Sequence, residues 1–386
     1  MDMIVLGGSG VMGSEIADLL LKYSDANITI ASNDQKGLNK VAEQLNNRVN
    51  TQVIDINDMD NLIGLIKKFD IVINAIGPFY ETCIKILKAS MQAKVNFVDI
   101  NDDYDAIQWE LALHEEAKNA GMTAVVGLGA SPGFTNILAK YGADKLDKVE
   151  DIHVFWSQST IDPTGSAAIE HWLHIISGEV PMFLNGEWKN VHALSEPQTV
   201  NFIKPVGDLE LFYTGHPEPV TLPRYIKGVK NVIIKGGLFP PRIMDIWKTF
   251  TTLGFGSEKK FIIDDYSIPL RKLAVKLIRS MPHFAPKYFE DLFIDAMKKY
   301  KGCAGAVKVE VIGEGDGEKL KYVYDISAKS VKFGTAFPAA IGAIMMSKNE
   351  IKQKGVFAPE GALDAAKFLS ATKKEIIVYE NGKKMK

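Results

Sequence analysis

Cysteine is scarce in this chain, and long hydrophobic runs are missing. Cys83 and Cys303 are the two cysteines among 386 residues, too few for a disulfide framework or a zinc site. The seven histidines are scattered without the spacing of a metal-binding cluster, so we expect no metal ion. No apolar stretch approaches the roughly 18 residues that a membrane-spanning helix needs. These absences favour a protein of the reducing cytoplasm.

A strong charge imbalance is also absent. The 45 basic and 47 acidic residues leave a net charge of -2, which gives no reason to expect a nucleic-acid partner or a membrane surface. The N-terminus lacks the basic start and long apolar core of a signal peptide. The hydrophobic content of 46% is ordinary for a globular protein, and the length allows two domains.

The first part of the chain alternates short apolar runs with amphipathic helical patterns. The apolar runs cover residues 3–7, 27–32, 50–56, 70–77, 95–100 and 122–129. Several are apolar on both faces, which is typical of parallel strands covered by helices. This order predicts right-handed βαβ units in a doubly wound sheet, the α/β Rossmann type.

From about residue 150 to 331 the pattern changes. Longer, more alternating runs over 149–159, 231–237, 306–315 and 320–327 predict a mixed or antiparallel sheet, and hence a second α/β domain. The segment 269–300 has a helical pattern that we expect to break at Pro282 and Pro286. The tail of the chain is helical again.

The stretch GGSGVMG contains glycines at the spacing G-x-G-x-x-G, directly after the first predicted strand. We expect Gly8 to allow a tight turn, Gly10 to let backbone N–H groups approach a pyrophosphate, and Gly13 to let the next helix pack on the sheet. A phosphate would then lie at a helix N-terminus, with Ser9, Val11 and Met12 beside it. The alternative is a glycine-rich turn that binds no ligand.

The end of the second strand discriminates between NAD and NADP. An acidic residue there would hold the adenosine ribose and repel a 2′-phosphate. If the strand ends at Ser32, a small hydroxyl with Asn33 and Lys36 nearby tolerates a phosphate, so we favour NADP, with NAD possible. A shift of two residues would instead make Asp34 the ribose carboxylate.

Other candidate cofactor residues follow the remaining strands, because ligands bind at the carboxyl ends of strands in such sheets. We expect Asn74, Ala75, Gly77 and Pro78 beside the nicotinamide end, and Asp55 and Ile56 near the adenine edge. Plain strand-terminating turns and a helix cap are the alternatives. Ser131 begins a helix on the same side, where the N–H groups of residues 131, 133 and 134 would be available to a carboxylate or ribose.

The chain resembles the saccharopine dehydrogenase-like NAD(P)-dependent oxidoreductases. The resemblance is carried by GGSGVMG, NITIAS, DIND, DIVINAIGPF, VNFVDI and GLGASPGFTNILA, and later by TGHPEPVTLPRY, TAFPAAIGAIMM and IKQKGVFAPEGALD. It implies a Rossmann domain of residues 1–131 completed by C-terminal helices in 334–386. It also implies a substrate-binding and dimerisation domain over 132–333, and hence a homodimer. Where the saccharopine-forming enzymes tend to have an acid, this chain has Ser131.

Three residues are candidates for contact with the substrate. Arg224 has the planar guanidinium that suits a carboxylate, although a surface ion pair is the alternative. His216 lies in a loop between Gly215 and Pro217, and a histidine side chain can donate or accept a proton near neutral pH, although a lone histidine is often structural. Asp99 ends the fifth strand, where a carboxylate would orient a substrate amine.

The resemblance implies hydride transfer at a C–N bond, between an imine and a secondary amine, in an amino-acid-derived substrate with carboxylate and amine or imine groups. Two alternatives stay open. One is a different hydride transfer on the same scaffold, such as reduction of a C=C bond or oxidation of a simple amino acid. The other is a non-catalytic NAD(P)-binding sensor or scaffold.

Overall fold

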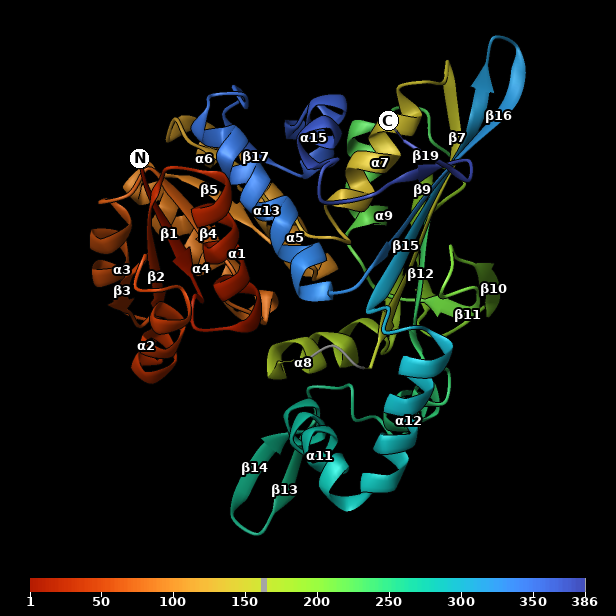
Figure 1. The fold of residues 1–386 in the computed structure, drawn as a ribbon, viewed down its shortest axis with the longest axis horizontal. Helices are drawn as coiled ribbons and strands as arrows, with labels where there is room; N and C mark the ends of the chain where they lie inside the picture. Colours follow the sequence, from red (N-terminus) through yellow and green to blue (C-terminus); the bar gives the residue numbers. More distant parts are fainter. Residues whose placement is uncertain (161–164, 386) are drawn as a thin grey trace. The chain divides into compact units, whose positions relative to one another are not determined.

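The computed structural model describes residues 1–160 and 165–385, and these form two compact units. One unit consists of residues 1–141 and 332–375, and the other of the described residues within 142–331 and 376–386. Each unit is built around its own sheet. Figure 1 shows the fold, with the chain coloured from red at the N-terminus to blue at the C-terminus. No helix among the described residues is long and apolar enough to cross a membrane.

The first unit has a seven-stranded parallel sheet in the order β17-β6-β5-β4-β1-β2-β3. Its strands are β1 (Asp2–Leu6), β2 (Asn27–Ser32), β3 (Asn50–Val53), β4 (Ile71–Asn74), β5 (Asn96–Asp99), β6 (Thr123–Val125) and β17 (Gly355–Phe357). All four residues of β4 are buried, as expected for a central strand covered by helices on both faces. The predicted doubly wound α/β fold is confirmed.

Helices connect these strands and return to the first unit near the end of the chain. They are α1 (Val11–Tyr23), α2 (Gln35–Gln44), α3 (Met59–Ile66), α4 (Phe79–Ala93), α5 (Tyr104–Ala112), α6 (His114–Asn119), α7 (Phe134–Ala143), α13 (Val331–Ser347), α14 (Pro359–Ala362) and α15 (Ala365–Thr372). The late helix α13 lies beside α1 (Figure 1), where Phe337 makes an edge-on ring contact with Tyr23 and Lys332 forms an ion pair with Glu15.

The second unit has a ten-stranded mixed sheet, as the alternating pattern predicts. Its strands are β7 (Lys148–Ser159), β8 (Glu179–Leu184), β9 (Glu187–His192), β10 (Gln198–Asn201), β11 (Asp208–Tyr213), β12 (Asn231–Phe239), β15 (Gly305–Gly315), β16 (Glu318–Ala328), β18 (Tyr379–Glu380) and β19 (Lys383–Lys384). Strand β7 pairs parallel with β12 and antiparallel with β15.

The described part of the second unit also contains a small hairpin and five further helices. The hairpin is β13 (Lys260–Ile263) with β14 (Tyr266–Pro269), and the helices are α8 (Ser166–Ile175), α9 (Glu218–Tyr225), α10 (Ile243–Thr252), α11 (Leu270–Phe284) and α12 (Pro286–Lys299). We expected the helix to end at Pro282, but Pro282 lies inside α11 and the helix ends before Ala285, its C-cap residue. Pro286 begins α12, where its missing N–H costs nothing.

The end of the chain differs from the expectation for residues 334–386. Residues 376–386 belong to the second unit, where β18 pairs with β16. Strand β17, which the sequence did not indicate, adds a seventh strand to the first sheet beside β6. Both segments contain only two or three strand residues each, too few for an alternating pattern to register.

Candidate functional site

The glycine loop between β1 and α1 is closely packed against the sheet. The tight turn lies at Gly7, whose φ of 80° favours glycine, and not at Gly8 as we expected. A Cβ atom on Gly8 would lie 2.5 Å from Cβ of Ile30, so Gly8 is required by contact with β2. A Cβ atom on Gly13 would lie 2.3 Å from the carbonyl oxygen of Gly7. Helix α1 can therefore approach β1 only because Gly13 has no side chain.

The N-terminus of α1 has no side-chain cap. Gly10 occupies the N-cap position without a side-chain hydrogen bond, and its N–H donates to Gly7 O at 2.9 Å. Intrahelical bonding starts at Ser14, whose N–H donates to Gly10 O at 3.0 Å. The N–H groups of Val11, Met12 and Gly13 thus belong to the first turn, where backbone donors and the helix dipole favour an anion.

The end of β2 lies next to this loop. Ser32 is the last residue of β2, as the NADP interpretation requires, and the hydroxyls of Ser9 and Ser32 are 2.7 Å apart. Asp34 is the N-cap of α2, and its Oδ1 accepts the N–H of Gly37 at 3.0 Å. Asn33 and Lys36 are exposed. The carboxylate of Asp34 therefore has a structural partner at the start of α2.

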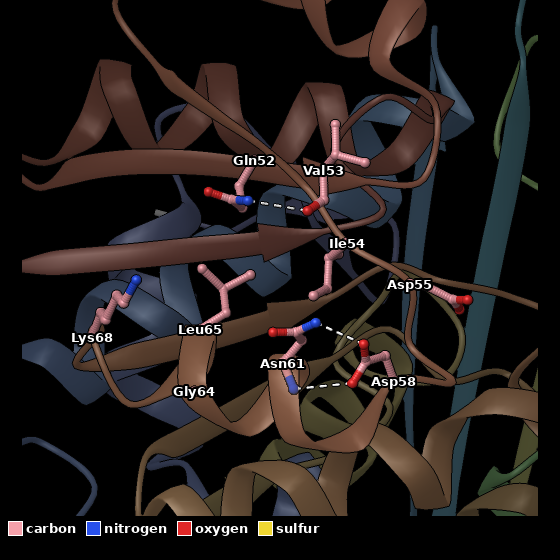
Figure 2. Close-up of a pocket in the computed structure, with 9 residues that line it drawn as sticks. All are labelled: Gln52, Val53, Ile54, Asp55, Asp58, Asn61, Gly64, Leu65 and Lys68. Atoms are coloured by element: carbon pink, nitrogen blue, oxygen red, sulfur yellow. Dashed lines mark hydrogen bonds between the residues drawn. The ribbon is translucent and has the colours of Figure 1, made fainter.

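A hollow of about 500 Å³ lies along β3 and α3 (Figure 2). Asp55 lies at the opposite end of it from Lys68, as Figure 2 shows. Asp55 Oδ1 accepts the N–H of Asn57 at 2.9 Å, which closes a turn after β3, and Ile56 between them is partly buried. Asp58 caps α3. The hollow has acidic groups at the carboxyl end of β3, where we expected the adenine edge.

The loop after β4 is fixed by backbone and side-chain bonds. Asn74 Oδ1 accepts the N–H of Ile76 at 3.0 Å, and the N–H of Ala75 donates to Leu6 O at 2.9 Å. The bond between Gly77 and Pro78 is cis. The Ala75 carbonyl lies so close to Gly7 that a Cβ there would be 2.7 Å from its oxygen. The predicted residues of the β4 loop and the glycine loop are thus brought together.

Asp99 lies at the end of β5 in the interior of the first unit. It has no exposed surface, and its Oδ1 accepts the N–H of Gly127 at 2.7 Å and that of Asn101 at 3.1 Å. Burial raises the pKa of Asp99 to about 6. Glu110 of α5, also without exposed surface, contacts Asp99. Sequence reasoning missed Glu110, although a glutamate beside Ala106, Ile107 and Leu111 on the apolar face of a helix was a usable signal.

Two of the three N–H groups that we expected to be available in the turn at Ser131 already have partners. The N–H of Gly133 donates to Asn136 Oδ1 at 2.9 Å, and the N–H of Phe134 donates to Gly129 O at 2.8 Å. Asn136 in turn donates to Glu360 at 3.0 Å. These donors are already used within the first unit, so the expectation that they bind a carboxylate or ribose is corrected. Ser131 precedes a cis proline.

His216 lies among buried polar side chains of the second unit. Its side chain is 5% exposed, and its Nδ1 lies 3.1 Å from Oε2 of Glu218. An ionised Glu218 carboxylate can only accept a hydrogen bond, which places the hydrogen on Nδ1 and leaves Nε2 for another partner. The rings of Trp156 and His171 lie 5.4 and 5.7 Å from the His216 ring. A histidine held in this way by a carboxylate is suited to proton transfer.

Two polar atoms of this region have no hydrogen-bond partner among the described residues. They are Nε1 of Trp156 and Oγ1 of Thr214, both buried. An indole N–H can only donate, and a buried donor without an acceptor is costly. Trp156 packs under Gly236, where a Cβ would lie 2.1 Å from its ring. The arrangement suits a ligand that brings an acceptor group.

Arg224 is not brought together with His216 by any observed contact within the described residues. It lies in the last turn of α9 and is exposed. Its Nε donates to Val220 O at 3.1 Å, and its guanidinium lies 5.8 Å from the ring centre of Trp188. Asp99 lies in the first unit, whereas His216 and Arg224 lie in the second.

Comparison with known proteins covers nearly the whole chain. The family model described as the saccharopine dehydrogenase NADP binding domain matches residues 3–125, and the saccharopine dehydrogenase C-terminal domain matches residues 129–377. The chain is 25% identical over 399 residues to a carboxynorspermidine synthase of Vibrio alginolyticus, covering 94% of this chain and 92% of that protein. It is 22% identical over 407 residues to a carboxyaminopropylagmatine dehydrogenase of Synechocystis, covering 96% and 95%.

A solved structure supports the fold. The apo saccharopine dehydrogenase (L-Glu forming) of Saccharomyces cerevisiae matches with a TM-score of 0.69 and 16% identity, covering 100% of each chain. The NADP-binding family model and the glycine loop after β1 together make NADP(H) the cofactor. The resemblance inferred from the motifs is thus confirmed. The chain belongs to the saccharopine dehydrogenase family of NAD(P)-dependent oxidoreductases.

Proposed function

We propose that this protein transfers a hydride between NADP(H) and the carbon of a C–N bond, interconverting an imine and a secondary amine in an amino-acid-derived substrate. The observation that carries the proposal is the buried pair of His216 and Glu218 beside the unpartnered donors of Trp156 and Thr214. The names of the relatives, a carboxynorspermidine synthase and a carboxyaminopropylagmatine dehydrogenase, support an amine product that carries a carboxyl group.

The first unit would bind the cofactor. We assign the pyrophosphate to the N–H groups at the start of α1, and the adenosine 2′-phosphate to Ser32, Asn33 and Lys36 after β2. The turns after β3 and β4 would hold the adenine and the nicotinamide ends. The remaining predicted cofactor residues of these loops are Gly8, Ser9, Gly10, Asp34, Asp55, Ile56, Asn74, Ala75, Gly77 and Pro78, whereas Ser131 lies in the turn between β6 and α7. When bound, NADPH supplies the hydride.

The second unit would bind the substrate. Reduction of an imine adds a hydride to carbon and a proton to nitrogen, and we assign the proton transfer to Nε2 of His216. Glu218 holds the imidazole in orientation and stabilises its protonated form. The donors of Trp156 and Thr214 would bind an acceptor group of the substrate, and Arg224 a second carboxylate.

Asp99 takes a different part in this proposal. Its carboxylate is enclosed in the first unit and already accepts two backbone N–H groups. The Asp99 side chain also has no exposed surface that a substrate amine could reach. We therefore assign Asp99 a positioning role rather than substrate contact.

We further propose a cytoplasmic homodimer. Both cysteines are buried and form no disulfide, which suits a reducing compartment.

The dimer is supported by exposed large apolar side chains in residues 253–297, on β13, β14, α11, α12 and the segments beside them. An apolar surface of this kind supports association with a second copy of the chain. These side chains are Leu253, Phe261, Ile262, Tyr266, Leu277, Phe284, Phe293, Ile294 and Met297. Sedimentation of the wild type and of Ile262→Lys would test this, with a monomeric wild type contradicting it.

Turnover with a substrate panel tests the proposed reaction. Purified protein is mixed with NADPH and pairs of an amine and a keto acid or aldehyde, and NADPH oxidation is followed. We expect His216→Asn to lower kcat/KM by at least 100-fold without a change in NADPH affinity. His192→Asn, an exposed histidine of the same unit, is the matched control. NADPH binding without turnover of any pair would favour the sensor alternative, and full activity in His216→Asn would remove His216 from the mechanism.

A further inference from the structure

Four polar side chains, from the last residue of β5 to helix α5, lie in the interior of the first unit. Asp99, Asn101, Asp103 and Glu110 each have no exposed surface, and we refer to them as the β5 polar network. Burying a carboxyl group is costly unless it is hydrogen-bonded. Three carboxyl groups in one buried cluster therefore require hydrogen bonds that compensate the free-energy cost of their burial.

The β5 polar network joins three loops at the carboxyl edge of the sheet. Asp99 Oδ1 accepts the N–H of Gly127, after β6, at 2.7 Å and that of Asn101 at 3.1 Å. Asn101 Oδ1 accepts the Asp103 N–H at 3.0 Å. Asp103 Oδ2 accepts the N–H groups of residues 79 and 80, the first of α4, at 3.1 and 3.2 Å. The loops after β4, β5 and β6 are thus connected by one chain of hydrogen bonds.

The same chain contains a contact between two carboxyl groups. Glu110 Oε2 accepts from Asn101 Nδ2 at 2.7 Å. The other oxygen of Glu110, Oε1, and Oδ2 of Asp99 have no donor among the residues described, although the two carboxyl groups touch. Two ionised carboxylates in a buried contact repel each other, whereas a single proton between them forms a hydrogen bond.

We propose that Glu110 is a positioning residue that stays neutral and donates its proton to the Asp99 carboxylate, and that this shared proton holds the three loops in the arrangement that binds NADP(H). The link to the cofactor rests on the proposed function, which places the nicotinamide end at these loops. No bond to the cofactor is formed by the pair.

The neighbouring carboxyl groups and burial favour retention of the proton, whereas the N–H groups of Gly127 and Asn101 lower the pKa of Asp99 and the Asn101 side chain lowers that of Glu110. Burial is the main cause that raises the pKa of both carboxyl groups, and the Asp99 carboxylate raises that of Glu110 further. Asp102 and Asp103 act on the pair from the loop before α5. Cys83 faces the pair from α4, and burial raises the pKa of its thiol, so it stays neutral.

The variants Glu110→Gln and Glu110→Met distinguish the effect of the Glu110 hydrogen bonds from the effect of its side-chain volume. Glutamine keeps the geometry, because its NH₂ donates to Asp99 and its oxygen accepts from Asn101. Methionine has a similar size but leaves both partners unpaired. Infrared difference spectra of wild type minus Glu110→Gln at pH 7.5 are recorded without cofactor. Glu115→Gln, an exposed glutamate on α6 that is 71% exposed, is the control.

We expect the carboxylic-acid C=O band of Glu110 in the first difference spectrum and not in the control. We also expect Glu110→Gln to bind NADPH within twofold of wild type, and Glu110→Met at least tenfold more weakly. Absence of the acid band, or equal NADPH affinity in a folded Glu110→Met, would overturn the proposal. If the methionine variant does not fold, the infrared band and the glutamine variant decide. A wild type that fails to bind NADPH contradicts only the proposed function, because the band needs no cofactor.

Discussion

At the residue scale, small side chains set how closely the cofactor loop packs. Gly13 stacks directly on the Gly7 carbonyl, so an added methyl group meets backbone rather than a movable side chain. Such an overlap can be relieved only by a shift of α1 or of the loop. The conformation of the loop and the stability of the domain are therefore coupled at this one position.

We predict that Gly13→Ala destabilises the protein by about 1–3 kcal/mol and weakens NADPH binding at least tenfold. Gly64→Ala on α3 is the control, since a Cβ there meets nothing within 4 Å. Removal of a helical glycine should stabilise the protein by about 0.5–1 kcal/mol. Urea unfolding and NADPH titration measure both effects. Equal stability of Gly13→Ala and wild type would contradict the packing argument.

A second residue-scale effect concerns Glu310 of β15. Burial alone would raise its pKa, but bonds from His153 and Lys321 outweigh this and lower the pKa to about 2. The Lys321 Nζ lies 2.8 Å from Oε1, and the His153 Nδ1 3.5 Å from Oε2. A carboxyl group whose pKa is lower in the folded state stabilises the fold above its unfolded pKa, near 4.3, and this contribution is lost as the pH falls toward 2.

We predict that Glu310→Gln lowers the free energy of unfolding by about 1–2 kcal/mol at pH 7, a value that allows for solvent screening of the partly exposed pairs. The difference from wild type should shrink as the pH falls below about 4.3. Urea unfolding at pH 7 and pH 3 measures it, with Glu318→Gln at the exposed start of β16 as control. A difference that stays constant down to pH 3 would exclude the ion pairs as its cause.

At the element scale, Asp34 is the N-cap residue of α2, which gives it a structural role at the start of this helix. The side chain caps α2, while Ser32 ends β2 and contacts Ser9. The sequence left two alignments open, and the choice between them depends on a shift of two residues. A strand end cannot be placed that finely from propensity, because the hydrogen bonds that end β2 come from β1 and β3, which are distant in the sequence.

We predict that Asp34→Ala lowers the free energy of unfolding by about 1 kcal/mol, the usual value for loss of an N-cap, and changes NADPH affinity less than threefold. Glu43→Ala near the end of the same helix, exposed in the structure, serves as control. Thermal unfolding and cofactor titration measure the two quantities. A large loss of NADH affinity without a loss of stability would instead identify Asp34 as a ribose ligand.

Elements of the first sheet were more predictable than those of the second. Runs such as residues 3–7 and 70–77 are apolar and follow each other at regular βαβ spacing, so β1 and β4 could be placed from the sequence. Strands β8 to β11 were not recognised. Strands β9 and β10 are largely exposed and carry no apolar periodicity, whereas β8 and β11 are partly buried but only six residues long. The β5 polar network was missed because Glu110 and Asp99 meet only when α5 packs on the sheet.

At the scale of the whole molecule, the chemistry is divided between two units. The first carries the glycine loop and the β5 polar network, and the second carries His216 with Glu218. The motifs identified the family and its cofactor, because the glycine spacing and the strand ends are local in the sequence. The surroundings of His216 could not be predicted from the sequence, because its neighbours Trp156 and His171 come from separate segments of the second unit.

The central claim is that the loop from β1 to α1, with Ser32 at the end of β2, binds NADP(H). It is tested most directly by titrating the purified wild type with NADPH and NADH while following reduced-nicotinamide fluorescence, with Gly10→Asp as the variant that places a carboxylate at the pyrophosphate site. We predict that NADPH binds at least tenfold more tightly than NADH, and that Gly10→Asp abolishes both. Tighter binding of NADH, no binding of either nucleotide, or unchanged NADPH affinity in Gly10→Asp would contradict the account.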